Sequence, residues 1–264
     1  LKSWFITMII GIPVLALITW IYYRLGKNFW LWAWGLVTVL SVFINFFYSE
    51  LIVPLFNRQT PLPESSLRTR IETFARETGF RLRDIYLIDG SKRSTKANAY
   101  FSGFGSKKRI VLYDTLLKEM SEEEIVAVLA HEIGHYKKKH VLRRLLSSIF
   151  ITGFMLFLFS LVVDNPALSE ALGAGRPSFH IGLVAFGILY SPLSLVIGLA
   201  GNFLSRRNEF EADLYVRQNY NPEFLASALK KLSVKNLSNM IPHPAYVFFH
   251  YSHPPLLARL ERLK

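Results

Sequence analysis

The chain has 264 residues, of which 51% are hydrophobic and 14% aromatic, and it carries a formal net charge of +12. An intrinsically disordered chain would contain fewer aromatic residues, so this class is excluded. The chain has no cysteine, which excludes a disulfide framework, a cysteine-ligated zinc site and a cysteine nucleophile.

Four stretches without a charged residue are each long enough to cross a membrane. About 20 helical residues span the roughly 30 Å hydrocarbon core of a bilayer. One such stretch could be a buried helix of a soluble protein, but four in one chain argue against that alternative. We therefore predict four transmembrane helices, in residues 4–23, 29–48, 145–163 and 179–204.

The distribution of basic residues predicts the orientation of these helices. If all four stretches cross, 27 of the 31 Lys and Arg residues lie on one side, in residues 50–144 and 204–264. Basic residues beside membrane helices favour the cytosolic side, so we expect this side to face the cytosol. The charge could also indicate nucleic-acid binding, but no nucleic-acid motif accompanies it.

The N-terminal stretch is too long for a cleavable signal peptide. Because the first residue is Leu1 rather than Met, we expect the natural N-terminus to lie further upstream.

The polar region between the second and third stretches combines helices with short strands. Pro61 and Pro63 frame a linker, and Gly79 ends the amphipathic helix that follows it. Ser121 and Glu124 form a capping box at the start of a second helix, which we expect to run unbroken into the third membrane stretch. The first helix is expected at residues 64–78, and strands at Asp84–Ile88, Asn98–Phe104 and Arg109–Tyr113.

The second helix contains the pattern His-Glu-x-x-His, formed by His131, Glu132 and His135. Residues i and i+4 share a helix face, so both imidazoles can bind one zinc ion. Glu132 is turned about 100° away and can act as the general base on a water molecule. The alternative is a solvated helix that carries two histidines by chance. The apolar neighbours instead indicate a buried helix, in which charged side chains are normally paired or bound to a metal.

A catalytic zinc needs a third protein ligand and one open position. Glu209 and Asp213 follow the fourth membrane stretch and share a helix face, so one can bind zinc while the other accepts the N–H of a ligand histidine. Glu211 points elsewhere and is expected to pair with Arg206 or Arg207. A cluster that contacts lipid headgroups is an equally good explanation of this run. His140 lies on a different face from His135, so we expect it at the membrane interface.

Five motifs in this order resemble the type I CAAX prenyl endopeptidases, which are integral-membrane zinc proteases of the gluzincin class. The resemblance extends from about residue 54 to the C-terminus, and it implies cleavage of the last three residues of prenylated CAAX proteins. The motifs are Asn-Ala-Tyr-Phe-Ser-Gly-Phe (98–104), Lys-Arg-Ile-Val-Leu-Tyr-Asp-Thr-Leu-Leu (108–117), His-Glu-Ile-Gly-His (131–135), Arg-Arg-Asn-Glu-Phe-Glu-Ala-Asp (206–213) and His-Tyr-Ser-His-Pro-Pro (250–255).

The resemblance also implies roles for single residues. It makes His131, His135 and Glu209 the ligands of one zinc ion and Glu132 the general base. His253 and Arg259 would position the peptide or stabilise the oxyanion. Without the resemblance, residues 98–104 would be an ordinary strand and His253 a loop histidine. In the family, Asn98, Ala99 and Tyr100 would lie on an edge strand that pairs with the substrate backbone.

The expected fold is mostly α, with multi-pass membrane helices and a small α+β gluzincin-like zinc protease domain. Lipid and a peptide or prenylated protein are the expected partners, and nucleic acid is not. The family is expected to have more membrane helices before the first one in this chain. We expect membrane helices in residues 1–49, a cytosolic α+β region in 50–144, two further membrane helices in 145–204 and a C-terminal helical region with the third zinc ligand in 205–264.

Two alternatives to a CAAX protease remain open. A membrane-protein quality-control protease like the HtpX group would share the same zinc site, and the motifs at 98–104 and 250–255 favour the CAAX type over it. A non-catalytic scaffold with structural zinc would need a fourth ligand, and the sequence offers no obvious residue for it.

Overall fold

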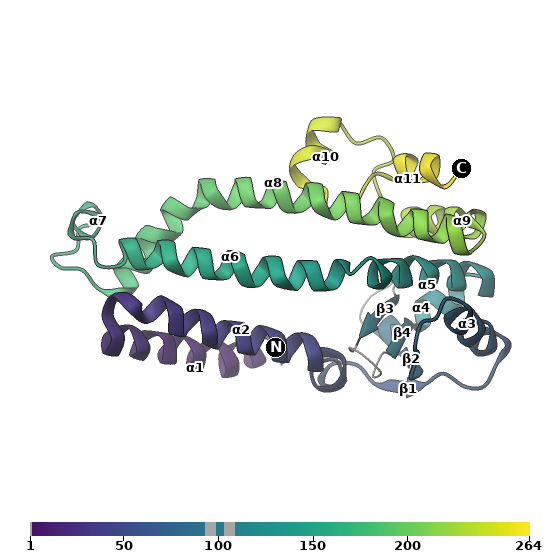
Figure 1. Cartoon of the computed structure of the whole chain (residues 1–264), viewed down its shortest axis with the longest axis horizontal. Helices are drawn as coiled ribbons and strands as arrows, with labels where there is room; N and C mark the ends of the chain where they lie inside the picture. Colours follow the sequence, from purple (N-terminus) through teal and green to yellow (C-terminus); the bar gives the residue numbers. More distant parts are fainter. Residues whose placement is uncertain (1, 93–98, 103–108) are drawn as a thin grey trace. The chain divides into compact units, whose positions relative to one another are not determined.

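The computed structural model describes residues 2–92, 99–102 and 109–264 (Figure 1). The chain forms two compact units. The first contains the residues up to Asn45 together with Leu142–Gly198, and the second contains Phe46–Val141 together with Leu199–Lys264.

Each of the four uncharged stretches lies in a helix, as predicted. Three helical runs are long and apolar enough to cross a membrane, and the first of them, Trp4–Leu55, contains the first two stretches, separated by a 3-10 turn at Gly26–Asn28. The helices are α1 (Lys2–Leu25), α2 (Phe29–Phe47), α6 (His140–Val162) and α8 (Phe179–Asn219), and a short helix α7 (Pro166–Ala171) lies between the last two.

Aromatic side chains hold the first unit together. Phe29 is fully buried and meets Phe159 and Phe179 edge to face. Helices α6 and α8 pack closely where α8 begins, because a Cβ on Gly182 would lie 2.6 Å from the carbonyl oxygen of Val163. One turn further from the connecting loop along each helix, Phe159 contacts Phe186. This order of contacts shows that the two helices are antiparallel here, as expected for two successive membrane crossings joined by a short loop.

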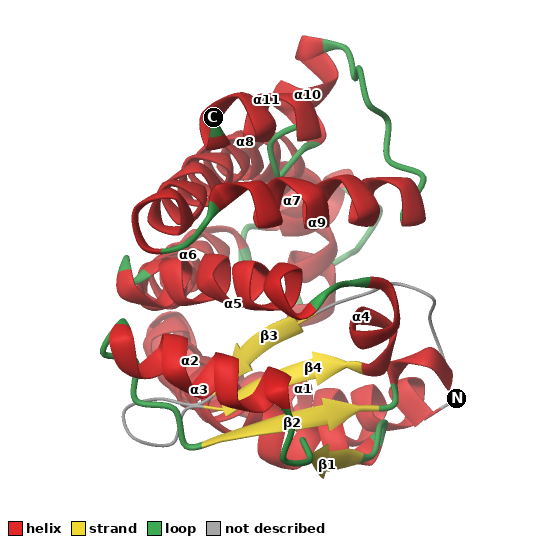
Figure 2. Ribbon diagram, turned by 90° about the vertical axis from the view of Figure 1, so that its right-hand side faces the viewer, coloured by secondary structure: helices red, strands yellow, loops and turns green. Residues whose placement is uncertain are grey.

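The second unit contains a four-stranded sheet in the order β1-β2-β4-β3, so β1 and β3 form its edges (Figure 2). Strands β2 and β4 are parallel, and each edge strand is antiparallel to its neighbour. The predicted strands 84–88 and 109–113 are confirmed; in the predicted strand 98–104, residues 98, 103 and 104 lie outside the described residues. The strands are β1 (Gln59–Pro61), β2 (Asp84–Ile88), β3 (Ala99–Ser102) and β4 (Arg109–Tyr113).

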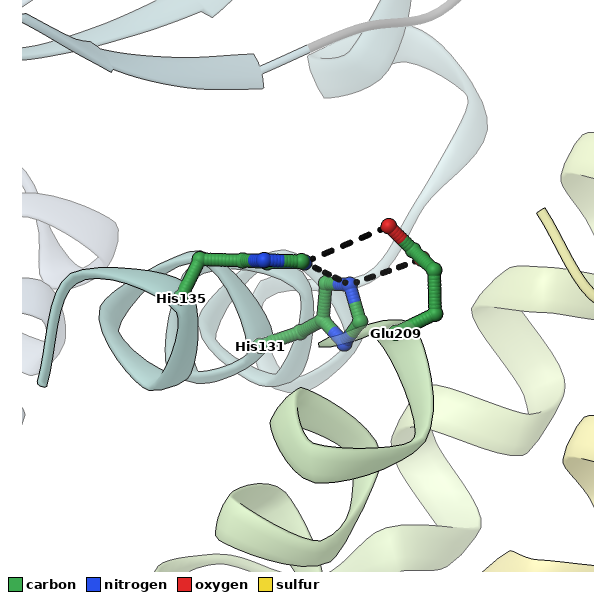
Figure 3. Close-up of side chains that lie close together, drawn as sticks. All are labelled: His131, His135 and Glu209. Atoms are coloured by element: carbon green, nitrogen blue, oxygen red, sulfur yellow. Dashed lines mark hydrogen bonds and ion pairs between the residues drawn. The ribbon is translucent and has the colours of Figure 1, made fainter. Parts of the chain in front are cut away.

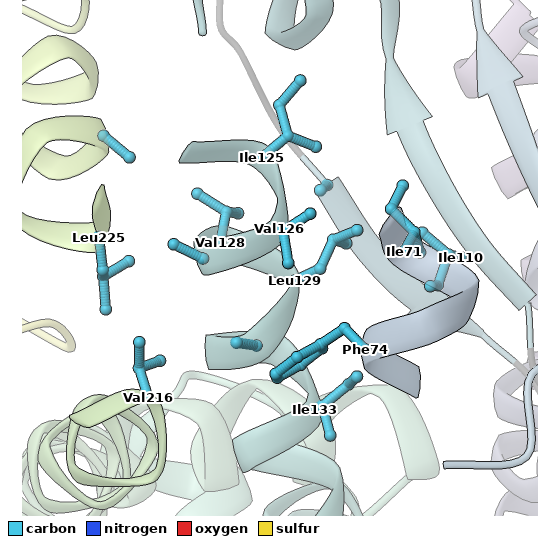
Figure 4. Close-up of a cluster of buried hydrophobic side chains, with 14 of the residues drawn as sticks. Ile71, Phe74, Ile110, Ile125, Val126, Val128, Leu129, Ile133, Val216 and Leu225 are labelled. Atoms are coloured by element: carbon cyan, nitrogen blue, oxygen red, sulfur yellow. The ribbon is translucent and has the colours of Figure 1, made fainter. Parts of the chain in front are cut away.

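Helix α5 is the centre of the hydrophobic core of the second unit. Its buried side chains include Ile125 and Leu129, which lie between the sheet with α3 on one side and α8 with α9 on the other (Figure 4). The helices of this unit, besides the end of α8, are α3 (Ser66–Glu77), α4 (Asp114–Glu119), α5 (Glu122–Lys137), α9 (Pro222–Lys235), α10 (Pro244–His250) and α11 (Leu256–Leu263).

The predicted capping box at the start of α5 is present, and its glutamate also joins α5 to α9. The buried carboxylate of Glu124 accepts hydrogen bonds from the Ser121 backbone N–H at 2.8 Å, the Ser227 hydroxyl at 2.6 Å and the Lys231 ammonium at 2.7 Å. Burial works against the charged form, but the hydrogen bonds from Lys231 and Ser227 outweigh it and lower the pKa of Glu124.

Replacing Glu124 by Gln is therefore expected to destabilise the second unit by about 1.5–3 kcal/mol, the usual worth of hydrogen bonds to a charged group. Thermal unfolding in mild detergent measures the change, and the half-buried neighbour Glu123→Gln, which loses only an ion pair with Arg70, is the matched control. Because the folded-state pKa of Glu124 is lowered, its stabilising effect is present above the unfolded-state pKa and is lost as the pH falls through the folded one. The unfolding temperatures of the wild type and of Glu124→Gln should thus converge in acid. A difference between them that does not change with pH would contradict this explanation.

The prediction of one unbroken helix from Ser121 into the third membrane stretch is wrong. Helix α5 ends at Lys137 and α6 begins at His140. Between them Lys139 has a φ of 58°, in the left-handed region that side chains other than glycine rarely adopt. The turn redirects the chain just before His140, so this histidine does not follow the face that a straight helix would give it.

Candidate metal centre

Helix α5 brings the two histidines of the His-Glu-x-x-His pattern together. Their Nε2 atoms are 3.1 Å apart, which is what residues i and i+4 on one helix face allow. The side chain of His131 is buried, while His135 is half-buried.

Glu209 on α8 completes the group (Figure 3). Its two carboxylate oxygens lie 3.4 Å from the Nε2 atoms of His131 and His135, respectively. Among the residues that the structure describes, these three are the group of His, Asp and Glu side chains able to share an ion, with ligand atoms within 4.8 Å of one another. Zinc–ligand bonds of about 2.0–2.1 Å at tetrahedral angles put neighbouring ligand atoms about 3.4 Å apart, so this donor set fits zinc.

The outer nitrogen of His131 is held by a buried ion pair. Its Nδ1 lies 2.9 Å from Asp213 Oδ1, and Arg259 donates to both oxygens of the same carboxylate, at 2.9 and 2.6 Å. Burial lowers the pKa of His131, but the hydrogen bonds to Asp213 and Glu209 outweigh it and raise that pKa to about 9. The surrounding carboxylates thus favour a positive charge beside this ring, which a bound metal ion can supply in place of the proton.

The outer nitrogen of His135 meets a different set of side chains. His135 Nδ1 lies 3.0 Å from Nδ1 of His140, whose Nε2 lies 3.1 Å from Glu211. Glu211 also accepts a hydrogen bond from Arg207, as expected. The prediction that His140 lies on a different face from His135 is wrong, because the two rings are in contact and the side chain of His140 is only 2% exposed. The turn at Lys139 explains the error, since a straight helix would place residues 135 and 140 on different faces.

Glu132 faces a cavity of about 170 Å³ that it lines together with His131, Glu209 and Arg259. Burial raises the pKa of Glu132, although the two neighbouring histidines act in the opposite direction. An apolar wall closes one side of this cavity. The wall consists of Leu116, Val128, Leu225, Leu229 and Leu232. It was not predicted from the sequence, although the spacing of the three leucines on α9 is that of one helix face.

The structure also brings the residues suggested by the family resemblance toward this cavity, with two exceptions. His253 lines it with an exposed ring, and its Nε2 lies 3.5 Å from Glu209. Ala99 of β3 lines it too, whereas Tyr100 points to the opposite face of the sheet and packs beside Tyr113. Burial raises the pKa of Tyr100 to about 12. Asn98 lies outside the described residues.

Comparisons with known proteins agree with this geometry. Residues 61–264 match the model of peptidase family M48, and residues 1–58 match a CAAX prenyl protease N-terminal model described as five membrane helices. The chain is a multi-pass membrane protein. All of it aligns with the CAAX prenyl protease 1 homologs of Arabidopsis thaliana and Homo sapiens, at 38% and 34% identity over 62% and 64% of those proteins.

A solved structure agrees as well. The crystal structure of S. mikatae Ste24p matches the whole chain with a TM-score of 0.93 and 35% identity. The chain covers 65% of that protein, so it spans less than two thirds of each of these relatives. On the match over residues 61–264, the chain belongs to peptidase family M48.

Proposed function

We propose that the protein is a membrane-embedded zinc endopeptidase that removes the C-terminal tripeptide of prenylated CAAX proteins. The observation that carries this proposal is the group of His131, His135 and Glu209 beside Glu132 in one cavity. The relatives named CAAX prenyl protease 1 support the choice of substrate.

One zinc ion per chain would be held by His131, His135 and Glu209. When bound, zinc polarises a peptide carbonyl and makes a water molecule more acidic. Glu132 takes the proton from the attacking water and gives it to the leaving amine, and burial, which raises its pKa, favours its taking up that proton. Asp213 fixes the ring of His131 by accepting its Nδ1–H, and Arg259 keeps that carboxylate in place.

The remaining residues of the cavity fit a peptide. His253 has an exposed ring whose N–H can stabilise the negative charge on the carbonyl oxygen during attack. Strand β3 lies at the edge of the sheet, where an extended peptide can add as a further strand, and Ala99 places this strand beside the metal group. The apolar wall offers space for an aliphatic side chain next to the scissile bond.

Cleavage of a farnesylated CAAX peptide by the purified protein tests this proposal. Mass spectrometry should detect release of the last three residues, and the same peptide without the lipid should be a poorer substrate. If the protein instead cleaves unfolded proteins at internal sites and leaves the farnesylated peptide intact, the quality-control alternative replaces the CAAX proposal.

The cytosolic orientation of the catalytic side is tested by single cysteines, since the chain has none of its own. In a bacterial inner membrane, cysteines at Lys138 and Lys230 should be protected from an impermeant reagent in intact cells. A cysteine at Ala174, in the loop between α6 and α8, should react. Labelling of Lys138→Cys together with protection of Ala174→Cys would reverse the topology.

We further expect His140 to affect zinc affinity through His135. If His135 binds zinc with Nε2, its Nδ1 carries the proton and donates to His140, which in turn donates from Nε2 to Glu211. His140→Asn keeps an acceptor near the position of Nδ1, whereas His140→Gln places its amide near the position of Nε2. We expect zinc affinity close to wild type for Asn and a roughly 10- to 100-fold loss for Gln and for Phe.

Chelator competition measures the zinc affinity of the three His140 variants, with thermal unfolding of the metal-free proteins as a control for folding. Equal affinities for the Asn and Phe variants would show that the hydrogen bond to His135 is not what His140 contributes.

A further inference from the structure

The end of α9, the loop that follows it and α10 together expose an unusual number of large apolar side chains. We name residues 234–249 the apolar segment. Leu237 and Ile241 are 91% and 83% exposed, although large apolar side chains on a surface in water are normally scattered singly. The exposed large apolar residues of the segment are Val234, Leu237, Met240, Ile241, Tyr246, Phe248 and Phe249.

Leu237 combines this exposure with an unfavourable backbone conformation. It follows the C-terminal end of α9 with a φ of 49°, a position usually taken by glycine or asparagine. Asn236 is the preceding residue, so a residue suited to this conformation is available one position away. Both the left-handed backbone and the exposure of the apolar side chain to water are energetically unfavourable for leucine. We take this to indicate that the side chain of Leu237 has a partner outside the chain.

Hydrogen bonds fix α10 to a particular point along α8. Asn202 donates from its side chain to the carbonyl oxygen of Phe249 at 2.9 Å, and Arg206 donates to those of Val247 and Tyr251 at 3.2 and 2.6 Å. The uncharged, membrane-crossing stretch of α8 ends at Leu204, between the two donors. Figure 1 shows α10 beside α8. If the uncharged stretch of α8 crosses the membrane, α10 lies at the level where α8 leaves the hydrocarbon.

We propose that the apolar segment binds the lipid surface, with its side chains in the boundary between headgroups and acyl chains. Helix α10 has 7 residues and is too short to span a bilayer, so it would lie in the interface. Three of its exposed residues are aromatic, and aromatic side chains are enriched at this depth. At the α9 end of the segment, the ammonium of Lys235 donates a hydrogen bond to Glu119 at 2.8 Å, which fixes this end to α4.

This lipid contact would act on the proposed catalytic site through the chain itself. His253 follows the last residue of α10 by three positions. Anchoring α10 in the interface therefore limits the movement of the loop that carries His253. The lipid contact itself does not depend on the proposed zinc chemistry.

Spin labels on single cysteines in the whole chain, reconstituted in phospholipid vesicles, test the proposal. Labels at Leu237→Cys, Ile241→Cys and Phe248→Cys should be highly accessible to oxygen, which concentrates in lipid, and poorly accessible to a water-soluble nickel chelate. Lys230→Cys is the matched control, because it is exposed on α9 outside the segment and should show the opposite preference. The replaced side chains are all exposed, and thermal unfolding of each variant in detergent checks its fold.

Two results would overturn the proposal. Nickel accessibility equal to that of the Lys230 label would place the segment in water. Low accessibility to both reagents at all three labelled positions would show that protein, rather than lipid, covers the segment.

Discussion

Replacing Glu132 by Gln is expected to lower the rate of peptide cleavage by roughly 10²- to 10⁴-fold while zinc stays bound. The amide keeps the size of the side chain but cannot take a proton from water. Zinc should stay because Glu132 is adjacent to the ligand group without belonging to it. Cleavage of the farnesylated peptide and metal analysis of the same purified sample measure both effects.

Glu123→Gln is the matched control for this variant, since the same substitution is made on the same helix away from the cavity. It should keep full activity. A Glu132→Gln protein that retains more than a few per cent of wild-type activity would remove Glu132 from the role of general base.

Replacing Glu209 by Ala is expected to reduce zinc affinity by more than about 100-fold, beyond the 10- to 100-fold loss typical of residues that only orient a ligand. The variant would lose one of the three proposed metal ligands, and it leaves Arg259 without one of its carboxylate neighbours. Asp213→Ala should fall within the 10- to 100-fold range, because Asp213 acts through His131. Chelator competition gives the affinities.

Glu211→Ala is the control for Glu209→Ala, since both change a glutamate of α8 near the same site. Glu211 reaches His135 only through His140, so a loss of a few-fold at most is expected. Equal zinc content in the Glu209 and Glu211 variants would refute the assignment of Glu209 as a ligand.

The parts of the site that depend on local spacing could be predicted from the sequence. Helical periodicity alone places His131 and His135 on one face, and the same rule pairs Glu209 with Asp213 on α8. The contact between α5 and α8 depends on long-range packing. The two helices approach closely at Gly134, where a Cβ would lie 3.1 Å from the Cα of Ala212. No local pattern encodes that approach.

Two parts of the structure were missed for different physical reasons. The left-handed turn at Lys139 has no sequence signal, since neither glycine nor asparagine occupies it, and the place of His140 depends on that turn. Strand β1 has only three residues, one of them Pro61, and exists because it pairs with β2 some 25 residues later. His253 and Arg259 come from a loop and a helix far along the chain, so only the family resemblance pointed to them.

The most direct test of the proposed function measures zinc and cleavage on one sample. Purified wild-type protein should contain one zinc ion per chain and release the tripeptide from a farnesylated CAAX peptide. A chelator should remove both the metal and the activity, and added zinc should restore both together. Full cleavage by protein from which the zinc has been removed would contradict the account.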